Sequence, residues 1–181
     1  MTTQEVTSTK AEKAATVTVK HWINGAETEG ASGRTQPIYN PATGEVSAQL
    51  VLGDEAVRVA AEAQKSWGRV SLAKRTGILF RMRELMVAHE LEIAKVISAE
   101  HGKTVEDARG EIARGRESIE FACGINQASK GDFSAEASTG VDVHNLRQPL
   151  GVVAGITPFN FPAMVPLWMH PVAIATGNAF I

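Results

Sequence analysis

The chain of 181 residues carries 18 lysines and arginines against 20 aspartates and glutamates, so its net charge is −2. This length allows one domain with a hydrophobic core, and 44% hydrophobic with 21% charged residues is an ordinary globular composition. The charge balance provides no basic surface for nucleic acid, and no uninterrupted apolar run reaches the roughly 18 residues of a membrane span.

The first 16 residues predict a disordered tail. They contain no apolar segment of the secretory type, and they lack arginine while carrying Glu5 and Glu12, which argues against a mitochondrial presequence. A single cysteine, Cys123, excludes an internal disulfide and suits a reducing compartment. We therefore expect a cytoplasmic protein whose folded part covers residues 17–181.

Short strands and turns open the folded part. Two runs are typical of strands, and each stands next to a turn signal: residues 17–23 before Asn24-Gly25, and residues 45–50 after a Pro- and Gly-containing turn. Asp54 is placed to cap a helix that ends near Trp67.

The middle of the chain is helical in pattern. Residues 72–99 predict a helix in two pieces that meet near His89, and Gly102 has the place of a glycine that ends a helix. Thr104, with an aspartate three residues later, resembles a capping box. We expect the helix that it begins to reach about residue 127.

The last part of the chain alternates strands with a helix. Residues 141–148 alternate like a strand after a loop that contains glycine and serine, and residues 151–156 have the length and β-branched content of a buried strand. A helix over residues 161–176 and the start of a strand at residues 178–181 complete a β-α-β unit. This order predicts an α/β fold with a parallel sheet.

The segment from Gly155 to Pro162 connects that strand to that helix, with Asn160 at the junction. Unpaired N–H groups and the positive end of the helix dipole favour negative charge there, such as a dinucleotide or a developing oxyanion. From its residue type alone, Asn160 is more often an N-cap of the helix. The absence of a Gly-x-Gly-x-x-Gly fingerprint argues against an ordinary dinucleotide loop.

Motifs in the right order resemble the aldehyde dehydrogenase superfamily. They are Trp22-Ile23-Asn24-Gly25, Tyr39-Asn40-Pro41-Ala42-Thr43-Gly44, Glu100-His101-Gly102-Lys103-Thr104, and Gly155 to Pro162 followed by Ala163 to Met169. Phenylalanine before Asn160 and the Pro-Leu-Trp-Met tail resemble the CoA-acylating methylmalonate-semialdehyde dehydrogenase branch. The resemblance covers about residues 20–181. It implies the N-terminal part of an NAD-binding domain, with residues 141–148 in an oligomerisation strand.

The resemblance also implies roles for five side chains. Asn160 would donate its side-chain N–H to the substrate oxygen as a thiohemiacetal forms, a contact typically worth about 3 kcal/mol. Ile156, Thr157 and Phe159 would line the NAD groove. Arg114 would bind the substrate carboxylate, which suits a guanidinium because it can form two parallel hydrogen bonds with a carboxylate.

Arg114 has a plainer interpretation as well. It lies opposite the apolar stripe of its predicted helix, so a solvated face with a weak Arg114–Glu111 ion pair is the alternative. Phe121 and Ile125 make that face partly apolar, which predicts that something covers it. Cys123 has no flanking histidine or lysine, and we expect a small buried side chain rather than a nucleophile.

The resemblance implies the N-terminal part of an NAD-dependent, CoA-acylating methylmalonate- or malonate-semialdehyde dehydrogenase, with coenzyme A as co-substrate and a homo-oligomer, by family a homotetramer, at full length. No metal is expected, because the five histidines show no ligand spacing. The alternatives are a hydrolytic semialdehyde dehydrogenase of the same superfamily and a non-catalytic truncated remnant. The apolar end at residues 179–181 indicates a chain cut within a strand. By resemblance the catalytic cysteine lies beyond it, so the chain alone is expected to be inactive.

Overall fold

The computed structural model describes residues 17–52 and 56–181. The helices are α1 (Ala56–Trp67), α2 (Leu72–Ala88), α3 (Glu90–His101), α4 (Val105–Cys123), α5 (Ile125–Ala128) and α6 (Met164–Ala175). The strands are β1 (Val17–Val19), β2 (His21–Ile23), β3 (Ala26–Thr28), β4 (Thr35–Tyr39), β5 (Val46–Val51), β6 (Phe133–Ser138), β7 (Val141–His144), β8 (Val152–Val153) and β9 (Ala179–Phe180). The predicted tail and the predicted cap Asp54 lie outside the described residues.

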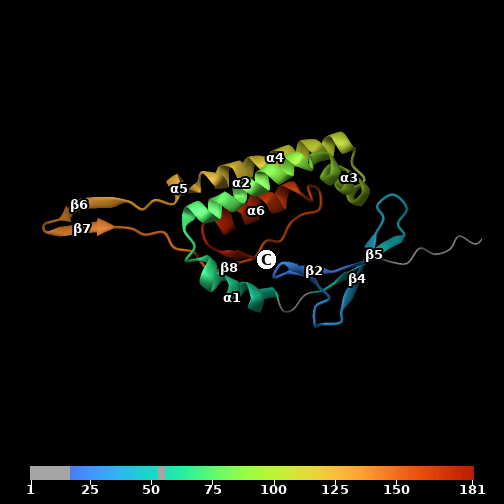
Figure 1. Cartoon of the computed structure of the whole chain (residues 1–181), viewed down its shortest axis with the longest axis horizontal. Helices are drawn as coiled ribbons and strands as arrows, with labels where there is room; N and C mark the ends of the chain where they lie inside the picture. Colours follow the sequence, from blue (N-terminus) through green and yellow to red (C-terminus); the bar gives the residue numbers. More distant parts are fainter. Residues whose placement is uncertain (1–16, 53–55) are drawn as a thin grey trace, which may run out of the picture.

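Helices α2, α4 and α6 pack against one another, and α3 packs on the N-terminal half of α4 (Figure 1). Between α2, α4 and α6 lies a buried cluster formed by Leu79, Ile119, Ala122, Ile125, Leu167 and Ala175. A second cluster joins α3 to α4 and is formed by Ala94, Ile97, Ala108 and Ile112. Each buried leucine or isoleucine contributes about 1.5–3 kcal/mol. The helical spacing of these residues along α4 fixes which face points inward.

The predicted β-α-β unit is confirmed. Strands β8 and β9 are parallel, with Val152 opposite Ala179, and α6 connects them on one side. The strand predicted over residues 151–156 is assigned only at Val152–Val153. Backbone hydrogen bonds nevertheless continue to Gly155, whose N–H donates to Ile181 O at 2.8 Å. The pairing thus reaches Ile181, and Ile156 follows the last paired residue on the β8 side.

The buried side chain of Asn178 links the two ends of this unit. Its side-chain oxygen accepts a hydrogen bond from Gly151 N at 3.0 Å, and its amide donates to Ala173 O and Thr176 Oγ1 at 3.3 and 2.9 Å. The residue is buried. One amide thus ties the start of β8 to the end of α6.

Strands β6 and β7 form a hairpin that projects from the body of the molecule (Figure 1). The strand predicted over residues 141–148 is present as β7 but ends at His144. The loop predicted before it was wrong at residues 133–138, which form β6. That segment contains no β-branched residue and is exposed on both faces, so its sequence lacks the usual strand signals.

Most predicted helix boundaries are confirmed. Helices α2 and α3 meet at His89, Gly102 ends α3 with φ of 84°, and Thr104 Oγ1 accepts a hydrogen bond from Asp107 N at 3.1 Å. The helix expected to reach residue 127 is instead interrupted at Gly124, which separates α4 from α5. Among the described residues, no helix is long and apolar enough to cross a membrane.

Helices α4 and α6 approach most tightly at Gly115. A Cβ atom at Gly115 would stand 2.5 Å from Leu167 Cδ1 and 3.3 Å from Met164 Cα. We expect Gly115→Ala to lower the free energy of unfolding by about 1–3 kcal/mol, because the helices must separate. Chemical denaturation measures this loss.

The matched control lies on the same helix. A Cβ atom at Gly110 meets no atom within 4 Å, so Gly110→Ala is expected to stabilise the helix by about 0.5–1 kcal/mol through its higher helix propensity. If Gly115→Ala raised the free energy of unfolding as much as Gly110→Ala, this would show that α4 and α6 do not approach closely at Gly115.

Candidate active site

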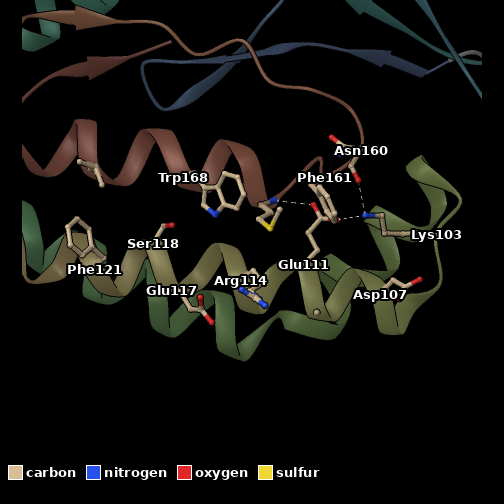
Figure 2. A pocket seen from close by; sticks show the side chains of 13 residues that line it. Lys103, Asp107, Glu111, Arg114, Glu117, Ser118, Phe121, Asn160, Phe161 and Trp168 are labelled. Carbon is tan, nitrogen blue, oxygen red and sulfur yellow. Dashed lines mark hydrogen bonds and ion pairs between the residues drawn. The ribbon is translucent and has the colours of Figure 1, made fainter.

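An open cavity of about 1100 Å³ lies between α4 and α6. It is lined by Lys103, Asp107, Gly110, Glu111, Arg114, Glu117, Ser118, Phe121, Asn160, Phe161, Met164, Trp168 and Val172. Figure 2 shows Asn160 and Lys103 at one end, with Arg114 on α4 and Trp168 on α6 further along the cavity. The structure therefore brings two of the predicted site residues, Asn160 and Arg114, to one cavity.

Asn160 is an exposed loop residue and not the N-cap of α6. The helix begins at Met164 with Ala163 in the N-cap position, so Asn160 lies three residues too early to cap it. Within the described part of the chain its side-chain amide makes no hydrogen bond, and only its backbone oxygen is bonded, to Lys103 Nζ at 3.1 Å. The amide is thus available to a ligand.

A buried acid–base pair that the sequence analysis missed stands beside Asn160. Glu111 Oε2 lies 2.6 Å from Lys103 Nζ, and Glu111 Oε1 accepts hydrogen bonds from Ala163 N at 2.6 Å and Met164 N at 3.0 Å. Burial alone raises the pKa of the Glu111 carboxyl, but the Lys103 ammonium and the two backbone N–H groups outweigh it and lower the pKa. Glu111 is therefore a buried carboxylate.

This pair replaces the Arg114–Glu111 ion pair of the plainer interpretation, which was wrong. Glu111 faces the start of α6 and not solvent, since its carboxylate bonds to Ala163 N and Met164 N. The residues one turn away from it on α4, Ala108 and Gly115, are buried as well. Those small neighbours at helical spacing are the signal that could have revealed its burial.

Arg114 is exposed at the wall of the cavity. No ion pair or hydrogen bond links its guanidinium to another residue of the described ranges, so its donors are available to an anion. Phe121 and Trp168 line the same wall. Of the partly apolar face expected to be covered, Ile125 is buried and Phe121 remains exposed.

The loop that follows β8 carries the other three predicted site residues. Ile156 and Phe159 are 94% and 88% exposed, and Thr157 is half-buried. They lie just past the carboxyl end of a parallel strand, where open α/β sheets bind their ligands. Two large apolar side chains that are exposed to solvent suit contact with a ligand that has flat apolar faces, such as a nicotinamide dinucleotide.

Cys123 does not belong to the cavity. Its thiol is half-buried on α4, and burial and the neighbouring Glu120 carboxylate raise its pKa although Arg83 opposes them. A raised pKa leaves little thiolate at neutral pH. Among the described residues no group of three histidine, cysteine, aspartate or glutamate side chains could hold a metal ion.

Residues 28–181 match the aldehyde dehydrogenase family. The chain belongs to this family. The superfamily predicted from the motifs and the α/β fold predicted from the order of elements are thereby confirmed.

The chain is similar to the malonate-semialdehyde dehydrogenase of Pseudomonas aeruginosa, with 47% identity over 169 residues, which are 91% of this chain and 34% of that protein. Among solved structures, methylmalonate-semialdehyde dehydrogenase of Oceanimonas doudoroffii matches with a TM-score of 0.82 and 45% identity over 91% of this chain and 34% of that one. A Sinorhizobium meliloti protein described as a methylmalonate-semialdehyde dehydrogenase, solved with NAD, matches with a TM-score of 0.86 and 42% identity over 93% and 35%. The chain thus spans about a third of these proteins' length.

Proposed function

We propose that the chain is the N-terminal part of an NAD-dependent, CoA-acylating malonate- or methylmalonate-semialdehyde dehydrogenase. One observation carries the proposal: a single cavity is lined by an amide and a guanidinium that have no partner in the described part of the chain, Asn160 and Arg114. A semialdehyde carries an aldehyde and a carboxylate a short distance apart. An amide N–H suits the oxygen of the first group, and a guanidinium suits the second.

In this proposal, Arg114 holds the substrate carboxylate and so orients the aldehyde toward Asn160. A cysteine thiolate outside this chain attacks the aldehyde carbon, and Asn160 Nδ2 donates to the oxygen as it becomes an oxyanion. NAD, when bound, accepts the hydride. The substrate carboxylate is then lost as carbon dioxide with a proton taking its place on the carbon, and the coenzyme A thiol displaces the cysteine from the remaining thioester.

Two surfaces of the chain would bind NAD and another subunit, respectively. Ile156, Thr157 and Phe159 would contact NAD through backbone and apolar surface, since the loop has no glycine fingerprint. The exposed hairpin of β6 and β7 presents open strand edges, which favour pairing with another chain. A homo-oligomer built through this hairpin is part of the proposal.

A graft tests whether this third of the family fold is catalytically competent. Residues 17–181 replace the matching segment of the Pseudomonas aeruginosa relative, and we call this protein the graft. It is expected to form NADH from malonate semialdehyde at a rate near that of the parent relative. A folded graft that forms no NADH would favour the non-catalytic remnant instead.

The acyl acceptor is tested separately. The protein expressed from the complete reading frame of the gene is assayed with malonate semialdehyde, with and without coenzyme A. CoA-dependent formation of an acyl thioester and carbon dioxide supports the acylating function. Release of a free acid without coenzyme A would establish the hydrolytic alternative, and a reading frame that ends at codon 181 would favour the remnant.

Arg114→Leu in the graft is expected to raise KM for malonate semialdehyde by about 10- to 100-fold and to leave KM for propanal unchanged. A hydrogen-bonded charge pair contributes about 1.5–3 kcal/mol, and only the first substrate has a carboxylate. Steady-state kinetics with both aldehydes measure the difference.

Arg116 provides the control. It lies on the same helix but pairs with Glu90 at 3.4 Å and does not line the cavity. Arg116→Leu is therefore expected to change KM for neither aldehyde. Equal losses on both substrates in Arg114→Leu would assign Arg114 a structural role.

A further inference from the structure

We propose that the Lys103–Glu111 pair positions the oxyanion donor: it fixes the backbone on both sides of Phe161 and thereby holds Asn160 in place at the end of the cavity. This inference rests on the proposed function of Asn160. Lys103 and Glu111 are positioning residues, since their contacts lead to Asn160 and not to the substrate.

The pair is built into the protein rather than lying on its surface. The side chains of Lys103 and Glu111 are 11% and 1% exposed, and their charged atoms stand 2.6 Å apart. Lys103 precedes α4 and Glu111 lies on it, so both come from the packed helical layer. The segment that they hold is more than 50 residues away in the sequence.

Glu111 binds the backbone on the C-terminal side of Phe161, at the start of α6. A helix leaves its first N–H groups without intrahelical acceptors, and at α6 the Glu111 carboxylate accepts from two of them, Ala163 N and Met164 N. A negative charge at this end also interacts favourably with the helix dipole. Glu111 thus supplies the cap that no side chain at the N-cap position provides.

Lys103 binds the backbone on the N-terminal side of Phe161, at Asn160. Its ammonium donates to Asn160 O at 3.1 Å and stands 4.7 Å from the centroid of the Phe161 ring (Figure 2). Glu111 supplies its counter-charge. The ammonium therefore has three partners, and two of them belong to the loop.

The loop depends on this contact for its position. Gly155 N is bonded to Ile181 O, and in the described structure the next hydrogen bond along the loop is the one from Lys103 to Asn160 O. The residues between these anchors include the highly exposed Ile156 and Phe159. Without the second anchor, the amide of Asn160 is free to turn from the substrate oxygen. A displacement of about 1 Å in a catalytic group can slow a reaction by roughly 100-fold.

Stability and positioning can be separated by removing both charges together. Lys103→Met or Glu111→Gln alone leaves a buried charge without its partner and destabilises the fold. The double variant Lys103→Met/Glu111→Gln has no buried charge, and glutamine Oε1 can still accept from the start of α6. Its Tm is therefore expected to be close to that of the parent graft. The backbone oxygen of Asn160 nevertheless lacks the hydrogen bond that Lys103 donates in the parent.

The test measures the acylation rate of the graft by its pre-steady-state burst of NADH. The double variant is expected to be at least roughly 10-fold slower than the parent graft at unchanged NAD affinity. In an Asn160→Ala background the same double substitution is expected to cost less than about 2-fold, because no donor remains to be positioned. The control double variant, Arg83→Met/Glu120→Gln, removes an exposed pair between α2 and α4 and should not change the rate.

The outcomes are distinct. A double variant that acylates at the parental rate, or whose loss multiplies with that of Asn160→Ala, overturns the positioning role while the proposed function stands. A parental rate in Asn160→Ala itself overturns the proposed role of Asn160 and the positioning inference with it.

Discussion

Asn160→Ala is expected to slow acylation by the graft by about two to three orders of magnitude, the loss typical of removing one oxyanion donor. The substitution removes no contact that supports the fold, because the Asn160 side chain makes no hydrogen bond within the described part of the chain. Its backbone bond to Lys103 remains. The burst rate of NADH formation measures the chemical step, and NAD titration should give an unchanged Kd.

A second asparagine serves as the control. Asn178 is buried and its side chain bonds to both β8 and α6, so Asn178→Ala is expected to lower the Tm. The Asn178→Ala molecules that remain folded should acylate at nearly the parental rate. A parental rate in Asn160→Ala would reduce Asn160 to a loop residue without a role in the chemistry.

Local patterns predict the helices of this chain well and its strands unevenly. The period of apolar residues and the caps at His89, Gly102 and Thr104 depend only on near neighbours, and the structure confirms them. Strand β6 was missed because its residues have low strand propensity and no buried face. Strand β8 is assigned over fewer residues than its apolar run, although its backbone hydrogen bonds to the partner segment continue to Gly155.

The candidate site divides in the same way. A short motif and a family resemblance point to Asn160 and Arg114, whose roles stay predictions, and the structure places both at one cavity. The contacts of Lys103 with Asn160 and of Glu111 with the start of α6 could not be predicted, because these partners lie 57 and 52 residues away in the sequence and only folding brings them together. From its residue type alone, Glu111 would be expected at the surface. Its burial against α6 is a property of the packed pair of helices.

The 181-residue chain by itself is expected not to reduce NAD in the presence of any aldehyde. Its one cysteine is Cys123, which does not line the cavity shared by Asn160 and Arg114. Burial raises the pKa of the Cys123 thiol, so a reactive thiolate is absent where the proposed chemistry needs one. Absorbance of NADH with malonate semialdehyde and propanal measures the activity.

The same chain is expected to elute from gel filtration as broad, concentration-dependent species. The large apolar side chains of Ile156 and Phe159 are exposed to solvent, and the edges of the β6–β7 hairpin are unpaired. Both features favour association between chains. Cys123→Ala in the graft provides the control and should retain full activity, because Cys123 is not the nucleophile. A monodisperse 181-residue monomer that reduces NAD with an aldehyde, and loses that activity in Cys123→Ala, would show that the chain carries its own nucleophile and would overturn the proposed need for a cysteine from elsewhere.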